Sequence, residues 1–123
     1  MKSISEENQG GSSIQSQHHT ESEANLVKVD EILKDLIPDF MTRRFQEMEQ
    51  LTQLQASQDF KGLAHYGHKL KGSSLNYGFT YLGQLAQHLE SAALSENSEE
   101  ISELVQKIHD HIKNVQIVYV EEL

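Results

Sequence analysis

Apolar residues recur every three to four positions along most of this chain, and this spacing predicts amphipathic α-helices. Four long stripes of this kind lie between residues 38 and 119, separated by short polar segments at 56–59, 76–78 and 95–98. Asn76-Tyr77-Gly78 predicts a turn with Gly78 at a positive φ. Asn97 or Ser98 is expected to cap the last helix, and Asn97 with Glu100 fits a capping box. The pattern favours an all-α fold, an up-down-up-down antiparallel four-helix bundle.

The two ends of the helical pattern are shorter and less regular. A short additional N-terminal helix is predicted over residues 26–37, from the spacing of Leu26, Val29, Ile32, Leu33 and Leu36. Pro38 marks a break there or the first turn of the next helix. Residues 116–120 are β-branched and aromatic, so they also fit a short strand. No partner strand is evident in the sequence, so we prefer a helical continuation to Tyr119.

Residues 1–22 consist mainly of Ser, Gln, Glu, Gly and His. Such a segment buries too little apolar surface to offset the entropy lost on ordering. We therefore expect a disordered N-terminal tail at 1–22 and one folded domain over 23–123.

Composition excludes several classes of protein. The chain has 123 residues with 19 acidic and 10 basic side chains, a net charge of −9 that disfavours nucleic-acid binding. It has no cysteine, hence no disulfide framework. No apolar run approaches the ~20 residues of a membrane span, and the first residues lack the apolar core of a secretory signal. A cytoplasmic, monomeric protein without membrane contact is expected.

One histidine stands out on the third predicted helix. At about 100° per residue, His68 lies about 140° from Leu63 and about 160° from Leu70, so it points away from the buried stripe. Lys71 and Gly72, one turn later, share its exposed face. An exposed neutral imidazole can attack phosphorus, and a lysine can offset the roughly two charges that a phosphoryl group brings.

Two glycines flank this histidine, and each costs roughly 1 kcal/mol in a helix interior. Gly72 leaves room for a partner to approach the imidazole. Gly67 is expected to thin the helix surface in the same way. The spacing alone is equally compatible with an ordinary surface histidine in a helical bundle.

The run from His68 to Ser73, His-Lys-Leu-Lys-Gly-Ser, resembles the histidine-containing phosphotransfer (HPt) domain of bacterial and fungal phosphorelays. The resemblance covers roughly residues 26–119, starts at Leu36-Ile37-Pro38-Asp39-Phe40, and includes Gly78 and the segment with Leu82, Leu85, Leu89 and Glu90. It implies a phosphorelay intermediate in which His68 takes a phosphoryl group from a receiver aspartate and passes it to another receiver. It implies no ATP-dependent kinase activity, no cofactor in this chain and Mg²⁺ in the receiver.

The resemblance also implies roles for neighbouring residues. Glu90 on the next helix would accept a hydrogen bond from His68 Nδ1–H, although it also fits a solvated carboxylate. Lys69 and Leu75, with Gly67, would border the docking surface for the receivers of a hybrid kinase and a response regulator, although Lys69 fits a solvated lysine equally well. Ser73 and Ser74 fit either a structural role or a partner contact, and Phe45 and Met41 fit the core better than that border.

Two alternative functions remain at this point. Metal binding would use histidines one turn apart plus a third ligand, drawn from His65, His68, His88, His109 and His111. The absence of cysteine and of a His-Glu-x-x-His motif disfavours it. The second alternative is a non-catalytic helical adaptor that binds partners through an acidic surface.

Overall fold

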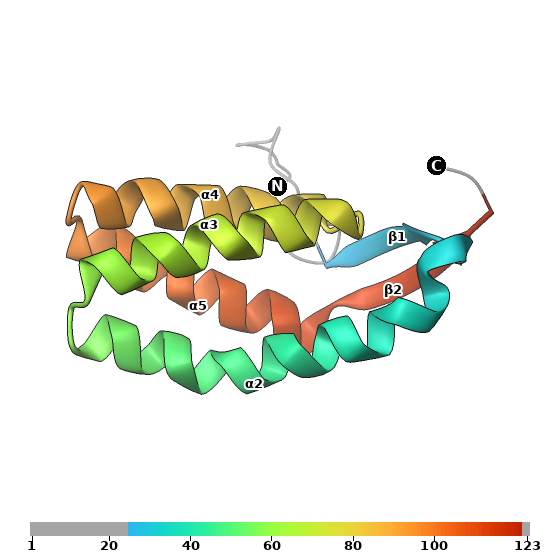
Figure 1. The fold of residues 1–123 in the computed structure, drawn as a ribbon, viewed down its shortest axis with the longest axis horizontal. Helices are drawn as coiled ribbons and strands as arrows, with labels where there is room; N and C mark the ends of the chain where they lie inside the picture. Colours follow the sequence, from blue (N-terminus) through green and yellow to red (C-terminus); the bar gives the residue numbers. More distant parts are fainter. Residues whose placement is uncertain (1–24, 122–123) are drawn as a thin grey trace, which may run out of the picture.

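The computed structural model describes residues 25–121, in which four α-helices form a bundle and two short strands extend from one end of it (Figure 1). In chain order the elements are β1 (Leu26–Asp30), the 3-10 helix η1 (Glu31–Leu36), α2 (Ile37–Ala56), α3 (Phe60–Asn76), α4 (Thr80–Leu94), α5 (Ser98–Asn114) and β2 (Gln116–Val120). The predicted four-helix bundle is confirmed. The predicted tail at 1–22 lies outside the described residues.

Short connections between the helices form where the sequence placed them. Gly78 has a φ of 85° in the turn after α3, as predicted. Asp59 caps α3 by accepting a hydrogen bond from the Gly62 N–H at 2.9 Å. Asn97 caps α5 by accepting from the Glu100 N–H at 3.1 Å. The Glu100 carboxylate contacts the Asn97 side-chain amide at 3.4 Å, so only half of the expected capping box is present.

The core lies between all four helices and also takes in β1. Its largest fully buried side chains come from every helix of the bundle and include Leu51, Leu63, Leu70, Phe79, Leu82, Leu89, Ile101, Ile108 and Ile112. Phe40 on α2 packs its ring 4.7 Å from that of Phe79 and 5.0 Å from that of Tyr77. These contacts tie the first turns of α2 to the turn between α3 and α4.

The predicted helix over 26–37 was wrong. Residues 26–30 form a strand in which Val27 and Val29 are buried while Lys28 is exposed, the alternation of a half-buried strand. Residues 31–36 form a 3-10 helix with no buried residue, capped by the Asp30 side chain. The helical spacing was misleading because Leu26, Ile32 and Leu36 are exposed. Pro38 lies in the first turn of α2.

The continuation of the last helix to Tyr119 was also wrong. α5 ends at Asn114, and β2 pairs with β1 in a parallel two-stranded sheet. The register joins Leu26 to Gln116 and Asp30 to Val120. The partner strand missing from the sequence analysis is the segment that had been assigned to a helix, so one error produced the other. The fold is therefore not purely helical.

A buried histidine lies where α5 meets β1. His111 is 2% exposed, its Nδ1 lies 2.8 Å from Asn25 Oδ1, and its Nε2 is buried without a partner among the described residues. The rings of Phe79 and Tyr81 pack edge-on against it. Burial lowers the pKa of His111 to about 4, because a proton on Nε2 would place an unpaired charge in the core.

This burial predicts loss of stability in mild acid. An unfolded histidine titrates near 6.5, so the unfolded state binds one more proton than the folded state between about pH 6.5 and 4. The free energy of unfolding should fall by about 2 kcal/mol from pH 7 to pH 5, measured by urea denaturation. His111→Leu should reduce this slope. If the free energy of unfolding depends on pH as steeply in that variant, another group is responsible. His109 is one such group, because its pKa is also lowered, first by burial.

Candidate functional site

His68 lies on the exposed face of α3 with a carboxylate beside it. Its side chain is 66% exposed, as the helical geometry predicted. His68 Nδ1 lies 3.3 Å from Glu90 Oε2 on α4, and Glu90 is 25% exposed. No other hydrogen bond or ion pair involves His68 within residues 25–121. The pair therefore leaves Nε2, on the opposite side of the ring, open to an approaching molecule.

Gly67 lets α4 pack closely enough on α3 for Glu90 to reach His68. It is buried, and a Cβ built there would lie 2.8 Å from the Ala86 carbonyl oxygen and 2.9 Å from the Glu90 backbone nitrogen. Real Cβ atoms essentially never approach backbone so closely, so α3 and α4 can pack this tightly only with glycine at the crossing. The expectation that Gly67 belongs to the partner-docking surface was wrong, because it faces α4.

Gly72 is exposed one turn after His68, whereas Lys71, which was expected on the same exposed face, is only partly exposed. A Cβ at Gly72 would have no atom within 4 Å, so the surface one turn after His68 is open. Lys69 is exposed, whereas Lys71 is half-buried, and the Lys71 carbonyl oxygen lies 3.8 Å from the Cβ position at Gly83 on α4. The structure thus brings His68, Lys71, Gly72 and Glu90 to one region of the surface.

Two large apolar side chains of α3 and α2 are exposed to solvent. Leu75, two turns after His68 on α3, is 52% exposed, and Phe45 on α2 is 50% exposed. Leu75 also packs onto α4, where a Cβ at Gly83 would meet its Cδ2 at 2.7 Å. Sequence reasoning missed this second close crossing. The expectation that Phe45 fits the core better than the surface was wrong.

A buried polar network that the sequence analysis did not identify joins α2 to α3. Arg44 is 6% exposed, donates to Ser73 Oγ at 2.9 Å and forms an ion pair with Glu47 at 3.1 Å. The Tyr66 hydroxyl donates to the other Glu47 oxygen at 3.1 Å. Burial, followed by the Glu47 charge, raises the pKa of Tyr66 far above its ordinary value, so this donor stays protonated. These bonds bracket His68 along α3 and fix α3 against α2.

The sequence held a signal for this network. Arg44 follows Phe40 by four residues, so it occupies the buried stripe of α2, and its guanidinium lies 4.7 Å from the Phe40 ring centroid. A charged residue in such a stripe requires a partner. The partner from α3 is Ser73, which gives that residue a structural role.

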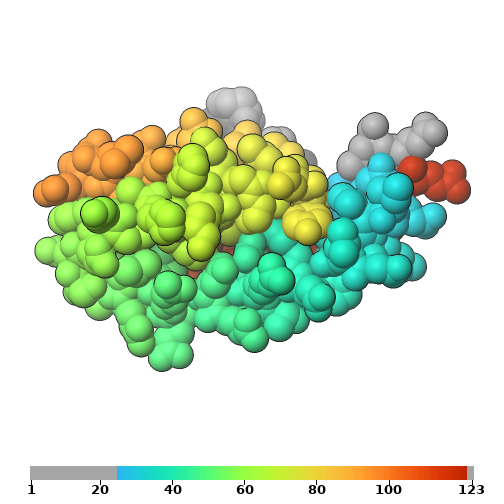
Figure 2. All heavy atoms as spheres, in the orientation of Figure 1, coloured from blue at the N-terminus to red at the C-terminus, as the bar shows by residue number. Residues whose placement is uncertain are grey.

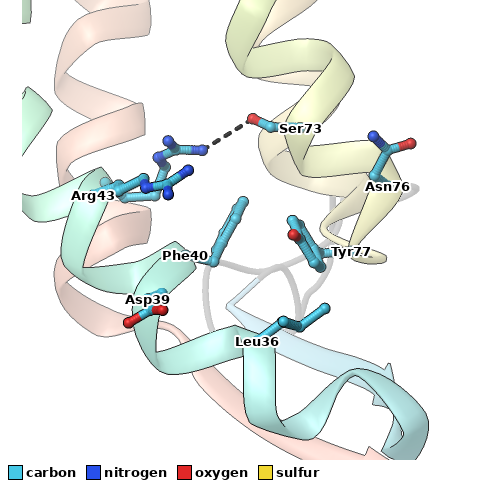
Figure 3. A pocket seen from close by; sticks show the side chains of 8 residues that line it. Leu36, Asp39, Phe40, Arg43, Ser73, Asn76 and Tyr77 are labelled. Carbon is cyan, nitrogen blue, oxygen red and sulfur yellow. Dashed lines mark hydrogen bonds between the residues drawn. The ribbon is translucent and has the colours of Figure 1, made fainter.

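A cleft follows the seam between α2 and α3, and Figure 2 shows these helices side by side on one face. Its part nearest η1 has a volume of about 270 Å³. Figure 3 shows Arg43, Ser73 and Asn76 around it, with the Phe40 and Tyr77 rings between the helices. Its other part, of about 390 Å³, is lined by His65, Lys69 and Tyr66 among others.

The helix that carries His68 is basic in an acidic chain, although the Glu90 carboxylate of α4 lies beside the histidine. Between Phe60 and Leu89 the sequence has Lys61, Lys69 and Lys71 but no aspartate or glutamate, in a chain of net charge −9. The lysines all lie on α3, the helix that carries His68. An acidic partner is therefore favoured at this surface over the rest of the molecule.

Residues 25–121 hold neither a metal-ligand cluster nor a membrane-spanning helix. No cluster of three or more His, Cys, Asp or Glu side chains there has the geometry to hold a metal ion. Within the same residues, no helix is long and apolar enough to cross a bilayer.

Comparison with known proteins identifies a protein family for this chain. The family model described as Hpt domain matches residues 31–117, which is most of the chain and includes α2 to α5. No curated protein and no solved structure matched. Hpt domains are phosphocarrier modules that interact with receiver domains in two-component phosphorelays. The chain belongs to the Hpt domain family.

Proposed function

We propose that this protein is a phosphorelay intermediate in which His68 carries the phosphoryl group. It accepts the group from an aspartyl phosphate on one receiver domain and passes it to the aspartate of another. The observation that carries the proposal is the exposed His68 imidazole with its Nδ1 held 3.3 Å from Glu90. An ordinary surface histidine has no need of such an orienting carboxylate.

Glu90 has a defined task in this mechanism. When it accepts the Nδ1–H of a neutral imidazole, the lone pair lies on Nε2 and faces outward. Nε2 attacks the phosphorus of the aspartyl phosphate, the N–P bond forms, and the bond from phosphorus to the aspartate oxygen breaks with its electrons leaving on the carboxylate. Nδ1 keeps its proton throughout. Transfer to the second receiver is the same step in reverse.

Lys71 and the lysine-rich surface offset the negative charge of this reaction. The phosphoryl group brings about two negative charges to Nε2, and Lys71 is one helical turn away on α3. The group sits on the side of the ring away from Glu90, so the carboxylate repels it less than direct contact would. Lys69 is better placed to contact the receiver than the phosphoryl group, because it is exposed and lies about 100° around the helix from His68.

The receivers of a hybrid kinase and of a response regulator are the proposed partners. Gly72 gives their acidic active sites access to His68, and the exposed Leu75 offers an apolar contact two turns away. Mg²⁺ bound in the receiver supplies charge stabilisation for the transfer. In this mechanism the phosphoryl group on His68 comes from a receiver domain and not from ATP, because this chain supplies no nucleotide site.

The test is transfer from a labelled receiver. A receiver carrying ³²P on its aspartate, mixed with this protein, should lose label to it, and the product should be labile to acid and stable to alkali, as expected of phosphohistidine. A helical adaptor would bind the receiver without acquiring label. Acquired label that survives acid would place the phosphate on another type of side chain and contradict the proposal.

Gly72 provides a test of where the receiver docks. Gly72→Gln should stabilise α3 by a few tenths of a kcal/mol or more, because the side chain meets open space and has higher helix propensity. The same side chain should obstruct the receiver. We expect an unchanged or raised melting temperature with transfer at least tenfold slower. Full transfer activity would show that the surface beside His68 is not the docking site.

A further inference from the structure

The cleft between α2 and α3 is lined by more positive charge than the surrounding side chains neutralise. Its larger part, of about 390 Å³, has Arg43 and Arg44 on the α2 wall and Lys69 on the α3 wall. Among the described residues that line this part, Glu47 is the only carboxylate. The lining is therefore positive in a chain whose net charge is −9.

Glu47 is already engaged inside the protein. Its Oε2 pairs with Arg44 at 3.1 Å, and its Oε1 accepts a hydrogen bond from the Tyr66 hydroxyl at 3.1 Å. Arg44 thus has its counter-charge, although its Nε lies buried without a hydrogen-bond partner within residues 25–121. Because one carboxylate offsets one cation, Glu47 leaves the charges of the other two cations in the cleft uncompensated.

Those two cations are Arg43 and Lys69, one from each wall. Both are exposed, and neither side chain forms an ion pair or a hydrogen bond with any residue from 25 to 121. Figure 3 shows Arg43 on α2 across from Ser73 and Asn76 on α3. Cations that line a concave surface concentrate positive potential in the space between its walls. The cleft is therefore suited to an anion that reaches both walls.

Size and charge indicate a small dianion. A cleft of about 390 Å³ lies in the range of small-molecule sites. A single carboxylate would offset only one of the two cations, whereas a phosphate group carries about two negative charges and several acceptor oxygens. Arginine binds phosphate through paired N–H groups, and lysine binds it as a point charge. The exposed Asp39 lines only the part of the cleft nearest η1, so no uncompensated carboxylate lines the larger part.

We propose that the larger part of the cleft binds the phosphate group of a small molecule, held between Arg43 and Lys69. An organic group attached to that phosphate would lie against Leu54 and Tyr66, which line the same part. The site is distinct from the phosphoryl group proposed for His68, because His68 lines neither part of the cleft. Binding there requires no phosphoryl transfer.

Titration of the full chain with inorganic phosphate tests the site in the absence of any receiver. At about pH 8 phosphate is largely a dianion. At constant ionic strength, the backbone amide NMR shifts should change around Arg43 and Lys69 and saturate with a Kd below about 10 mM. Acetate, a monoanion, should bind at least about fivefold more weakly. Phenyl phosphate identifies the source of the phosphate group: tighter binding than inorganic phosphate indicates an ester, and equal or weaker binding indicates free phosphate.

Single substitutions locate the bound phosphate. Arg43→Gln and Lys69→Gln should each weaken phosphate binding at least about fivefold, because each removes one of the two cations. Lys61→Gln is the matched control, since it removes an equal charge from an exposed side chain of α3 that does not line the cleft, and it should change the Kd less than about twofold. The amide spectra without phosphate verify that each variant is folded.

Four results would overturn the proposal. The first is the absence of saturable shifts in the wild type, and the second is saturable shifts confined to another surface. The third is an unchanged Kd in either folded cleft variant. The fourth is an equal loss of affinity in Lys61→Gln, which would show that phosphate responds only to the overall charge of α3.

Discussion

His68→Gln is expected to abolish phosphoryl uptake from a receiver while leaving the fold nearly intact. Glutamine has no nucleophilic nitrogen, so no N–P bond can form. The His68 side chain is 66% exposed and outside the core, so its replacement should change the free energy of unfolding by no more than about 0.5 kcal/mol. The measurements are ³²P transfer from a labelled receiver and thermal denaturation of the two proteins.

His65→Gln is the matched control for this experiment. His65 is exposed on the same helix, one turn before His68, and lines the cleft between α2 and α3. It should take no part in the chemistry, so this variant should acquire label at close to the wild-type rate. If the His68 variant acquires label and the His65 variant does not, the phosphoacceptor is His65 and not His68. Label lost in both would implicate the docking face more broadly.

Gly67→Ala is expected to destabilise the protein, although the same change usually stabilises a helix. The added methyl group would lie 2.8 Å from the Ala86 carbonyl oxygen and 2.9 Å from the Glu90 nitrogen, and both atoms are backbone. α3 and α4 must separate to admit it, and overpacking of this kind costs about 2 kcal/mol. Because Glu90 moves with α4, its contact with His68 should lengthen as well.

Gly72→Ala is the same substitution on the same helix, but it is expected to stabilise the protein. Its methyl group meets no atom within 4 Å, so the gain in helix propensity of up to about 1 kcal/mol should appear undiminished. Urea denaturation of both variants measures the change in the free energy of unfolding, which should be negative for Gly67→Ala and positive for Gly72→Ala. The ¹⁵N shifts of the His68 ring report separately which tautomer each variant holds, and so test the role proposed for Glu90. Stabilisation by both alanines would mean that the α3–α4 crossing is looser than the structure shows.

The sequence alone determined the helical part of this fold and the position of His68 within it. Helix formation depends on contacts three and four residues apart, and on caps such as Asn97 and turns such as Gly78, all of which are local in the chain. A helix with a known buried stripe also fixes which residues face outward. For this reason the exposure of His68 and the open surface at Gly72 were predictable.

Tertiary structure alone decided the features that depend on residues far apart in the sequence. β1 and β2 pair although all four α-helices lie between them in the sequence, and each strand by itself resembled part of a helix. Gly67 and Gly72 are the same residue type on one helix, yet only the position of α4 makes the first a packing requirement and the second an open surface. The Arg44 contact with Ser73 and the approach of Glu90 to His68 likewise exist only because separate helices meet. Local periodicity carries no information about which faces meet, since that is set by the packing of the whole core.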